Sequence, residues 1–152
     1  MEIRILDARL NDWGLPKYQT EGSAALDLFA CVDQTTLIQP QAPAVLISSG
    51  LALNFGDMGL AGLVLPRSGM GHKKGLVLGN TVGLIDPDYT GEIMISTWNR
   101  NPAGSDPITI QPGERIAQLL FVPVLRPDLT VVQEFSGATA RAAGGFGSTG
   151  SV

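Results

Sequence analysis

The chain has 152 residues and a formal net charge of −4 at pH 7, which argues against a protein that coats nucleic acid or an anionic membrane. Its 19 Gly and 10 Pro residues, with short apolar runs between them, predict many turns and one all-β domain, a sandwich or barrel. Cys31 is the only cysteine, so an internal disulfide is excluded. The charged start and the short apolar runs predict a cytoplasmic protein without a signal peptide or membrane span.

The first part of the chain predicts strands separated by turns. They are expected at residues 3–5, 24–30, 37–38, 44–47, 51–53 and 60–65, with a break at 11–16. Asp27 lies inside the apolar run 24–30. If its side chain is buried, it must be paired, hydrogen-bonded or near a metal, because burying a carboxylate alone costs several kcal/mol. It could also face outward on a half-buried strand, so the residues leave both interpretations open.

Residues 66–75 (PRSGMGHKKG) predict the one short helix of the chain. Ser68 suits its N-cap and Gly75 its C-terminal cap. The free N–H groups at its start, the Arg67 guanidinium and the Ser68 hydroxyl could together bind phosphate. The segment is not a P-loop, because its Gly and Lys spacing differs. His72, the only histidine, is interpreted as a solvated residue at the helix end and not as a catalytic base.

Residues 80–92 predict two short strands folded back on each other around the turn Asp86-Pro87-Asp88. Asp86 would end the first strand, held by the ladder on both sides, so its carboxylate could be aimed at a water or a metal. The same three residues are also ordinary turn formers. This segment alone does not decide between the two interpretations.

The last predicted strands cover residues 91–99, 108–110, 115–124 and 129–132. Arg115 and Gln118 are polar members of an apolar strand and therefore need partners. Residues 145–150 match G-x-G-x-x-G, but only two residues follow, so no helix can complete a dinucleotide-binding unit. The tail is either a disordered end or a segment that closes over a nucleotide.

Five segments, in this order, resemble the motifs of the trimeric deoxyuridine triphosphate nucleotidohydrolases, the dUTPases. They are residues 24–28 (AALDL), 66–69 (PRSG), 83–91 (GLIDPDYTG), 113–119 (GERIAQL) and 141–150 (RAAGGFGSTG). The resemblance covers nearly the whole chain and favours the functional interpretations of Asp86 and of the tail. One position departs from the family pattern: Ala25 stands where the family usually has Gly, next to Asp27. We expect the additional methyl group to be tolerated.

The resemblance implies a jelly-roll-type β-barrel over residues 1–135 and a flexible, Gly-rich tail over residues 136–152. The protein would be a homotrimer with shared active sites, in which each tail closes over the ligand of a neighbouring subunit. Its reaction would be the Mg²⁺-assisted attack of water on the α-phosphate of dUTP, giving dUMP and pyrophosphate. This reaction limits uracil incorporation into DNA and supplies dUMP for dTMP synthesis.

The resemblance also implies a role for each matched residue. Asp86 would be the general base, Tyr89 would pack against the deoxyribose and exclude a 2′-hydroxyl, and Asp27 would support the site through waters of Mg²⁺. Uracil would be bound by Asn80, Leu84, Ile85 and the backbone near Met94. The phosphates would be bound by Arg67, Ser68, Gly69 and Gln118. In the tail, the substrate contacts would be Arg141, Phe146, Gly147, Ser148 and Thr149, with the Phe146 ring against the base.

Two alternatives remain. A dCTP deaminase shares the implied fold, but the segment from Asp86 to Tyr89 and the Gly-rich tail argue against it. The other alternative is a nucleotide-binding regulator without turnover, and the presence of Asp86, Arg67 and the tail argues against this alternative. Ammonia release from dCTP would support the first, and nucleotide binding without pyrophosphate release the second.

Overall fold

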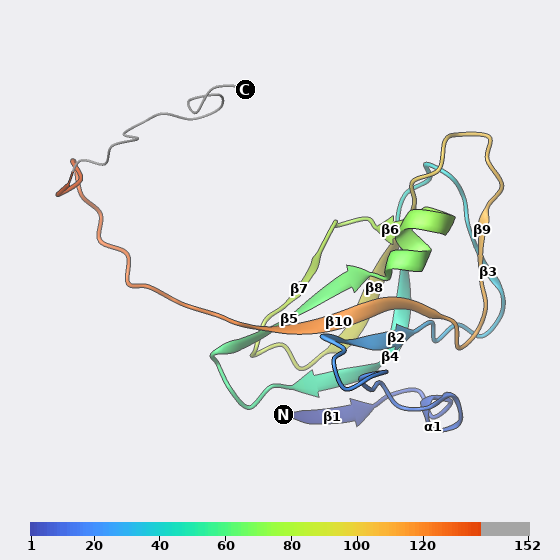
Figure 1. The fold of residues 1–152 in the computed structure, drawn as a ribbon, viewed down its shortest axis with the longest axis horizontal. Coiled ribbons are helices and arrows are strands. Elements are labelled where there is room, and N and C mark those ends of the chain that lie inside the picture. The colour runs from blue at the N-terminus through green and yellow to red at the C-terminus, as the bar shows by residue number, and fades with distance from the viewer. Residues whose placement is uncertain (138–152) are drawn as a thin grey trace.

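The computed structural model describes residues 1–137, which form ten strands and two short helical segments (Figure 1). The first four-stranded sheet has the order β1 (Glu2–Ile5), β4 (Val45–Asn54), β8 (Glu92–Asn99), β6 (Leu76–Leu78). The second has the order β2 (Ala25–Phe29), β10 (Arg115–Pro123), β5 (Leu60–Pro66), β7 (Gly83–Ile85). A two-stranded sheet pairs β3 (Thr36–Ile38) with β9 (Ile108–Ile110). The predicted all-β class is confirmed.

Alternation of side chains along the strands builds one core that both four-stranded sheets share. In β8, Ile93 and Ile95 are fully buried while Met94 between them faces outward. Leu28 of β2, Leu51 of β4 and further apolar residues of β5 and β10 belong to the same cluster. Each such buried side chain stabilises the fold by about 1.5–3 kcal/mol relative to exposure. No helix of the described residues is long and apolar enough to cross a membrane.

Two strand predictions differ from the structure. The predicted strands at 44–47 and 51–53 are one continuous strand, β4, which begins at Val45 and carries a register shift between Ser48 and Ala52. The predicted strand at 129–132 is wrong, because this segment has no ladder partner in the described chain. It extends away from the body of the protein after β10 (Figure 1), and its Val131 is 99% exposed.

The predicted helix at residues 66–75 is a short π-helix, η1 (Gly69–Lys74). Ser68 occupies its N-cap position, as predicted, although its hydroxyl makes no capping hydrogen bond. Gly75 ends the helix in the left-handed region, at φ +80°. A side chain there would collide with Asn101. A second helical segment, α1 (Leu10–Trp13), forms where only a break was expected.

The predicted hairpin at residues 80–92 is not formed. β7 pairs with β5 and β8 pairs with β4 and β6, so the two strands belong to different sheets. Residues 86–91 therefore connect one sheet to the other. Asp86 follows directly after β7 and is not held by a ladder on both sides.

Candidate active site

Asp27 lies near the middle of β2 and is 7% exposed. Its Oδ1 forms an ion pair with Arg67 Nε at 2.8 Å, and its Oδ2 accepts a hydrogen bond from Arg115 Nη1 at 3.1 Å. The interpretation of a buried, paired carboxylate is confirmed, and the outward-facing alternative is wrong. Because each oxygen meets a guanidinium group, the cost of removing this charge from water is offset.

The same group of residues fixes the end of β5. Arg67 Nη1 donates to the carbonyl of Arg115 at 2.9 Å, and Gln118 Nε2 donates to the carbonyl of Pro66 at 2.9 Å. The prediction that Arg115 and Gln118 have partners is confirmed. We call Asp27, Arg67 and Arg115 the arginine cluster. These three residues come from the segments 24–28, 66–69 and 113–119. β10, which carries Arg115, lies in the sheet between β2, which carries Asp27, and β5, which Arg67 follows.

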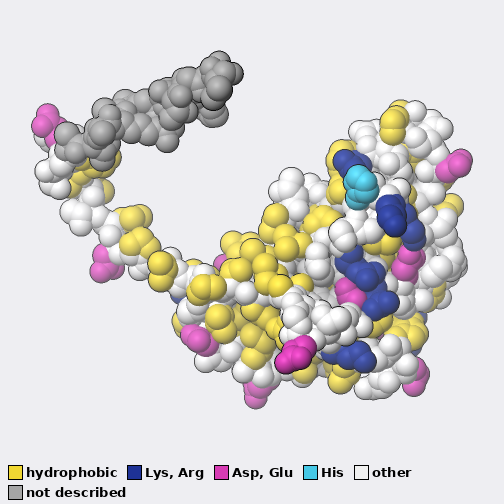
Figure 2. Space-filling view, viewed as in Figure 1, with side chains coloured by type: hydrophobic (Ala, Val, Ile, Leu, Met, Phe, Trp, Pro, Cys, Tyr) yellow, Lys and Arg dark blue, Asp and Glu magenta, His cyan; other side chains and the backbone are white. Residues whose placement is uncertain are grey.

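A pocket of about 300 Å³ adjoins the arginine cluster. It is lined by Arg67, Ser68, Gly69, Met70, Lys73 and Lys74, and so contains three of the predicted phosphate-binding residues. Sequence reasoning missed the two lysines of η1, although their place on the same short helix was a usable signal. Lys74 Nζ is paired with Glu114 at 2.8 Å. Figure 2 shows Lys and Arg side chains gathered with acidic ones on this side of the molecule.

A second pocket, of about 200 Å³, lies at the connection between β7 and β8. It is lined by Leu84, Ile85, Asp86, Tyr89, Glu92 and Met94. Asp86 is exposed, and no ion pair of the described residues involves it. The structure thus brings together five predicted site residues and adds Glu92, which sequence reasoning missed. Asn80 is exposed and does not line this pocket.

The two pockets lie toward opposite ends of β5. In the β5–β7 register, Ile85 pairs with Gly62 and Gly83 pairs with Val64, so Asp86 lies level with the start of β5. Arg67 follows the other end of that strand. At 3.3–3.4 Å per residue, the two side chains are separated by about 20 Å along the strand. The chain does not bring Asp86 next to Arg67 by itself.

The clear pKa shifts within the described residues belong to a group outside both pockets. The hydrogen bond from the Arg9 guanidinium holds the pKa of Asp7 below its usual value, and the same pairing raises the pKa of Arg9. Burial, followed by the nearby Asp7 charge, raises the pKa of the Cys31 thiol to about 12. Arg9 also lies 5.2 Å from the centre of the Trp13 ring. Arg9, the N-cap residue of α1, also donates to the carbonyl of Val32 at 2.9 Å, so this group links α1 to the segment after β2.

Comparison with known proteins places the sequence and the fold in one family. Residues 11–150 match the dUTPase family. The deoxyuridine 5′-triphosphate nucleotidohydrolases of Bordetella avium and Acinetobacter baylyi are each 54% identical to this chain, covering 99% of it and 97% of their own length. The structure of Staphylococcus bacteriophage 80alpha dUTPase with dUPNHPP aligns with a TM-score of 0.81 at 26% identity, covering 99% of this chain and 98% of that one. The chain belongs to the dUTPase family.

Proposed function

We propose that this protein is a dUTP diphosphatase, a hydrolase of nucleotide metabolism that converts dUTP to dUMP and pyrophosphate. The observation that carries the proposal is the pocket between β7 and β8, in which an open Asp86 carboxylate lies beside apolar side chains and the Tyr89 ring. Membership of the dUTPase family and the names of its relatives support the same reaction.

Asp86 is the proposed general base. Its exposed carboxylate can accept a hydrogen bond from water, orient that water toward the α-phosphate and accept its proton. The reaction requires no covalent intermediate with the protein. The leaving group is pyrophosphate, whose negative charge must be stabilised by cationic groups elsewhere in the site.

The rest of the pocket is proposed to bind the nucleoside. Leu84, Ile85 and the backbone near Met94 would bind uracil, with Asn80 as a further contact. The hydroxyl of Tyr89 donates to the carbonyl of Glu92 at 2.8 Å, so its ring has a fixed position. A ring held in this way would contact the deoxyribose and leave no space for a 2′-hydroxyl.

The phosphates are proposed to lie against the first pocket, on Arg67, Ser68 and Gly69. Gln118, which donates to the carbonyl of the adjacent Pro66, is the fourth proposed phosphate contact. Within residues 1–137, no three His, Cys, Asp or Glu side chains are grouped to hold a metal. This fits Mg²⁺, which commonly binds through substrate phosphates and retains its waters. Asp27 would contact it only through water, since both carboxylate oxygens already form ion pairs with arginines. Bound Mg²⁺ would neutralise phosphate charge.

A complete site is proposed to need more than one copy of the chain. The separation of about 20 Å between Asp86 and Arg67 prevents one chain from placing both on the same phosphate. A homotrimer with shared active sites would bring the two pockets of neighbouring subunits together. The proposed tail contacts Arg141, Phe146, Gly147, Ser148 and Thr149 lie outside the described residues. We further propose that residues 136–152 close over a neighbouring subunit's ligand, and that the enzyme is cytoplasmic.

Pyrophosphate release with Mg²⁺ from dUTP, dCTP, dTTP and UTP, measured in parallel, tests the reaction. We expect release from dUTP and little from the other three. Ammonia from dCTP would instead indicate a deaminase, and nucleotide binding without release from any substrate would indicate a regulator.

Mixing two inactive variants tests the shared site. Asp86→Asn and Arg67→Met chains should each be inactive alone. Refolded together at equal amounts, they should regain activity, because about a quarter of the shared sites then combine an intact Asp86 with an intact Arg67 from another chain. A mixture that stays as inactive as its parents, or a monomer in sedimentation, would contradict the shared site.

A further inference from the structure

The connection from Asp86 to Glu92 is closed by Tyr89. The backbone N–H of Tyr89 donates to the carbonyl of Asp86 at 3.1 Å, and its hydroxyl donates to the carbonyl of Glu92 at 2.8 Å. The Tyr89 ring lies so close to Gly91 that a Cβ added there would be 2.6 Å from ring carbon Cζ. The place of this ring is therefore set by the backbone of residues 91 and 92.

Glu92, the first residue of β8, is tied to the neighbouring strand by its side chain. Its carboxylate accepts a hydrogen bond from the hydroxyl of Ser48 on β4. The Ser48 hydroxyl in turn accepts from the N–H of Gly50 at 2.9 Å. The register of β4 and β8 shifts between the pairs Ser48–Met94 and Ala52–Glu92. The side-chain bond therefore spans the irregular part of the ladder.

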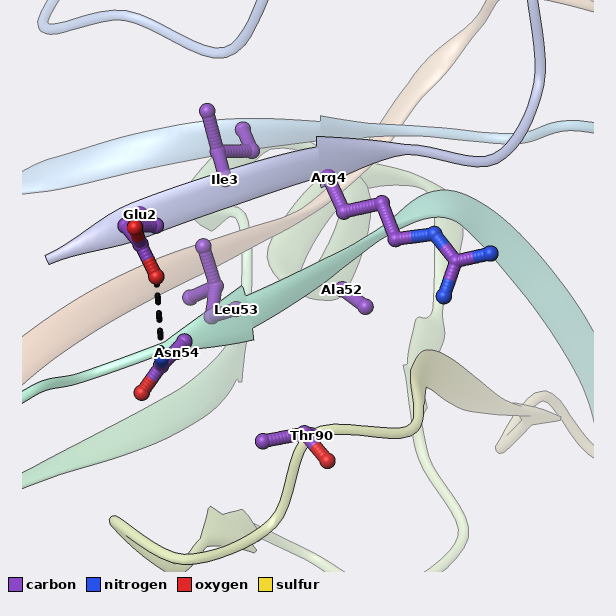
Figure 3. Close-up of a pocket in the computed structure, with 7 residues that line it drawn as sticks. All are labelled: Glu2, Ile3, Arg4, Ala52, Leu53, Asn54 and Thr90. Atoms are coloured by element: carbon purple, nitrogen blue, oxygen red, sulfur yellow. Dashed lines mark hydrogen bonds between the residues drawn. The ribbon is translucent and has the colours of Figure 1, made fainter.

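The other side of this connection is open. A pocket of about 450 Å³ separates Thr90 from β1 and from the end of β4. Figure 3 shows Thr90 across this space from Arg4, Ala52 and Leu53, and the hydrogen bond drawn there joins Glu2 to Asn54. At the end of the connection, the bond between Glu92 and Ser48 adds a side-chain contact to the ladder pair of Glu92 with Ala52.

We propose that Glu92 is a positioning residue that sets the selectivity for the 2′-deoxy sugar. Its carboxylate, anchored by Ser48, fixes the Glu92 carbonyl, and this carbonyl holds the Tyr89 hydroxyl and thus the ring. The inference rests on the proposed function, in which Tyr89 excludes the 2′-hydroxyl. The proposed role of Glu92 requires its accepting oxygen and not its negative charge, since the bond to Ser48 requires only an acceptor.

The test compares two replacements of Glu92 that have similar length. Glu92→Gln keeps an accepting oxygen, whereas Glu92→Met has none. In Glu92→Met, the ratio of kcat/KM for dUTP to kcat/KM for UTP should fall about tenfold, because one hydrogen bond that places the ring is lost. In Glu92→Gln, this ratio should stay within about twofold of the wild-type ratio.

Ser48→Ala removes the donor of the same bond and should lower the ratio as Glu92→Met does. The double variant should be no worse than either single variant, because both remove one interaction. Glu2→Met is the matched control, since Glu2 also accepts from a β4 side chain, Asn54, but lies across the open pocket from Thr90. Its ratio should be unchanged.

Several outcomes would overturn the inference. A dUTP-to-UTP ratio unchanged in Glu92→Met, with only a lower melting temperature, would make Glu92 merely structural. A loss in Glu92→Gln as large as in Glu92→Met would mean that the charge is required. If the wild-type chain releases no pyrophosphate from dUTP, the proposed function fails and this inference fails with it. If the wild type is active and selective but Glu92→Met is equally selective, only this inference fails.

Discussion

Two carboxylates beside the outer strands of one sheet have opposite surroundings. Asp27 lies on β2, at one edge of the second sheet, and each of its oxygens forms an ion pair with an arginine. Asp86 follows β7, at the other edge, where it is exposed and lacks an ion pair within the described residues. Asp27 is thus paired within one chain, whereas the carboxylate of Asp86 is exposed to solvent.

This difference matches what each role requires. A general base must have an accepting oxygen available to water, and a carboxylate gripped by two guanidinium groups does not offer one freely. Conversely, a cationic side chain binds phosphate better when it is held in one orientation before the ligand arrives. Asp27 gives Arg67 such an orientation, and the backbone carbonyl of Arg115 adds to it.

The largest expected effect is that of Asp86→Asn. The amide cannot accept the proton of the attacking water, so turnover of dUTP should fall by about 10²- to 10⁴-fold while nucleotide binding is kept. Pyrophosphate release gives the first quantity, and calorimetric titration with dUMP gives the second. Asp88→Asn, two residues further along, is the matched control and should keep near-normal turnover. Near-normal turnover in Asp86→Asn would remove this residue from the role.

Asp27→Asn should change stability where Asp86→Asn does not. It leaves two guanidinium groups without their buried counter-charge, so the free energy of unfolding should fall by about 2 kcal/mol, less than for a fully buried pair because both arginines are partly exposed. Urea unfolding at pH 7 measures this, with the exposed Asp106→Asn as the control. An unfolding midpoint equal to that of the control would show that the arginine cluster does not depend on Asp27.

Local sequence patterns predict only part of this structure. The all-β class follows from local patterns, as does the need of Arg115 and Gln118 for partners, because turns and buried polar residues impose the same requirements in any fold. Which strands pair does not follow from them. The sequence of β7 and β8 has the pattern of a hairpin, yet each strand pairs with strands elsewhere in the chain.

Long-range contacts explain the remaining errors. Residues 129–132 have the alternation of a strand, but no strand of the described chain lies beside them. Glu92 resembles any polar residue of an alternating strand, and only its bond to Ser48, 44 residues earlier, distinguishes it. The pairing of Asp27 with Arg115 likewise spans 88 residues. Such pairs depend on sheet order, which local patterns do not specify.

The smallest effect should come from Asp7, a paired acid like Asp27 but outside both pockets. Arg9 lowers the pKa of Asp7 in the folded chain, so the carboxylate stabilises the fold fully above the unfolded-state pKa of about 3.9 and loses this contribution as the pH falls through the lower folded value. Asp7→Asn should therefore unfold at lower urea concentration than wild type at pH 7, and the difference should shrink below about pH 4. Turnover of dUTP should be unchanged. A stability difference that is the same at pH 7 and pH 3 would show that packing of the side chain, and not its pairing with Arg9, makes the contribution.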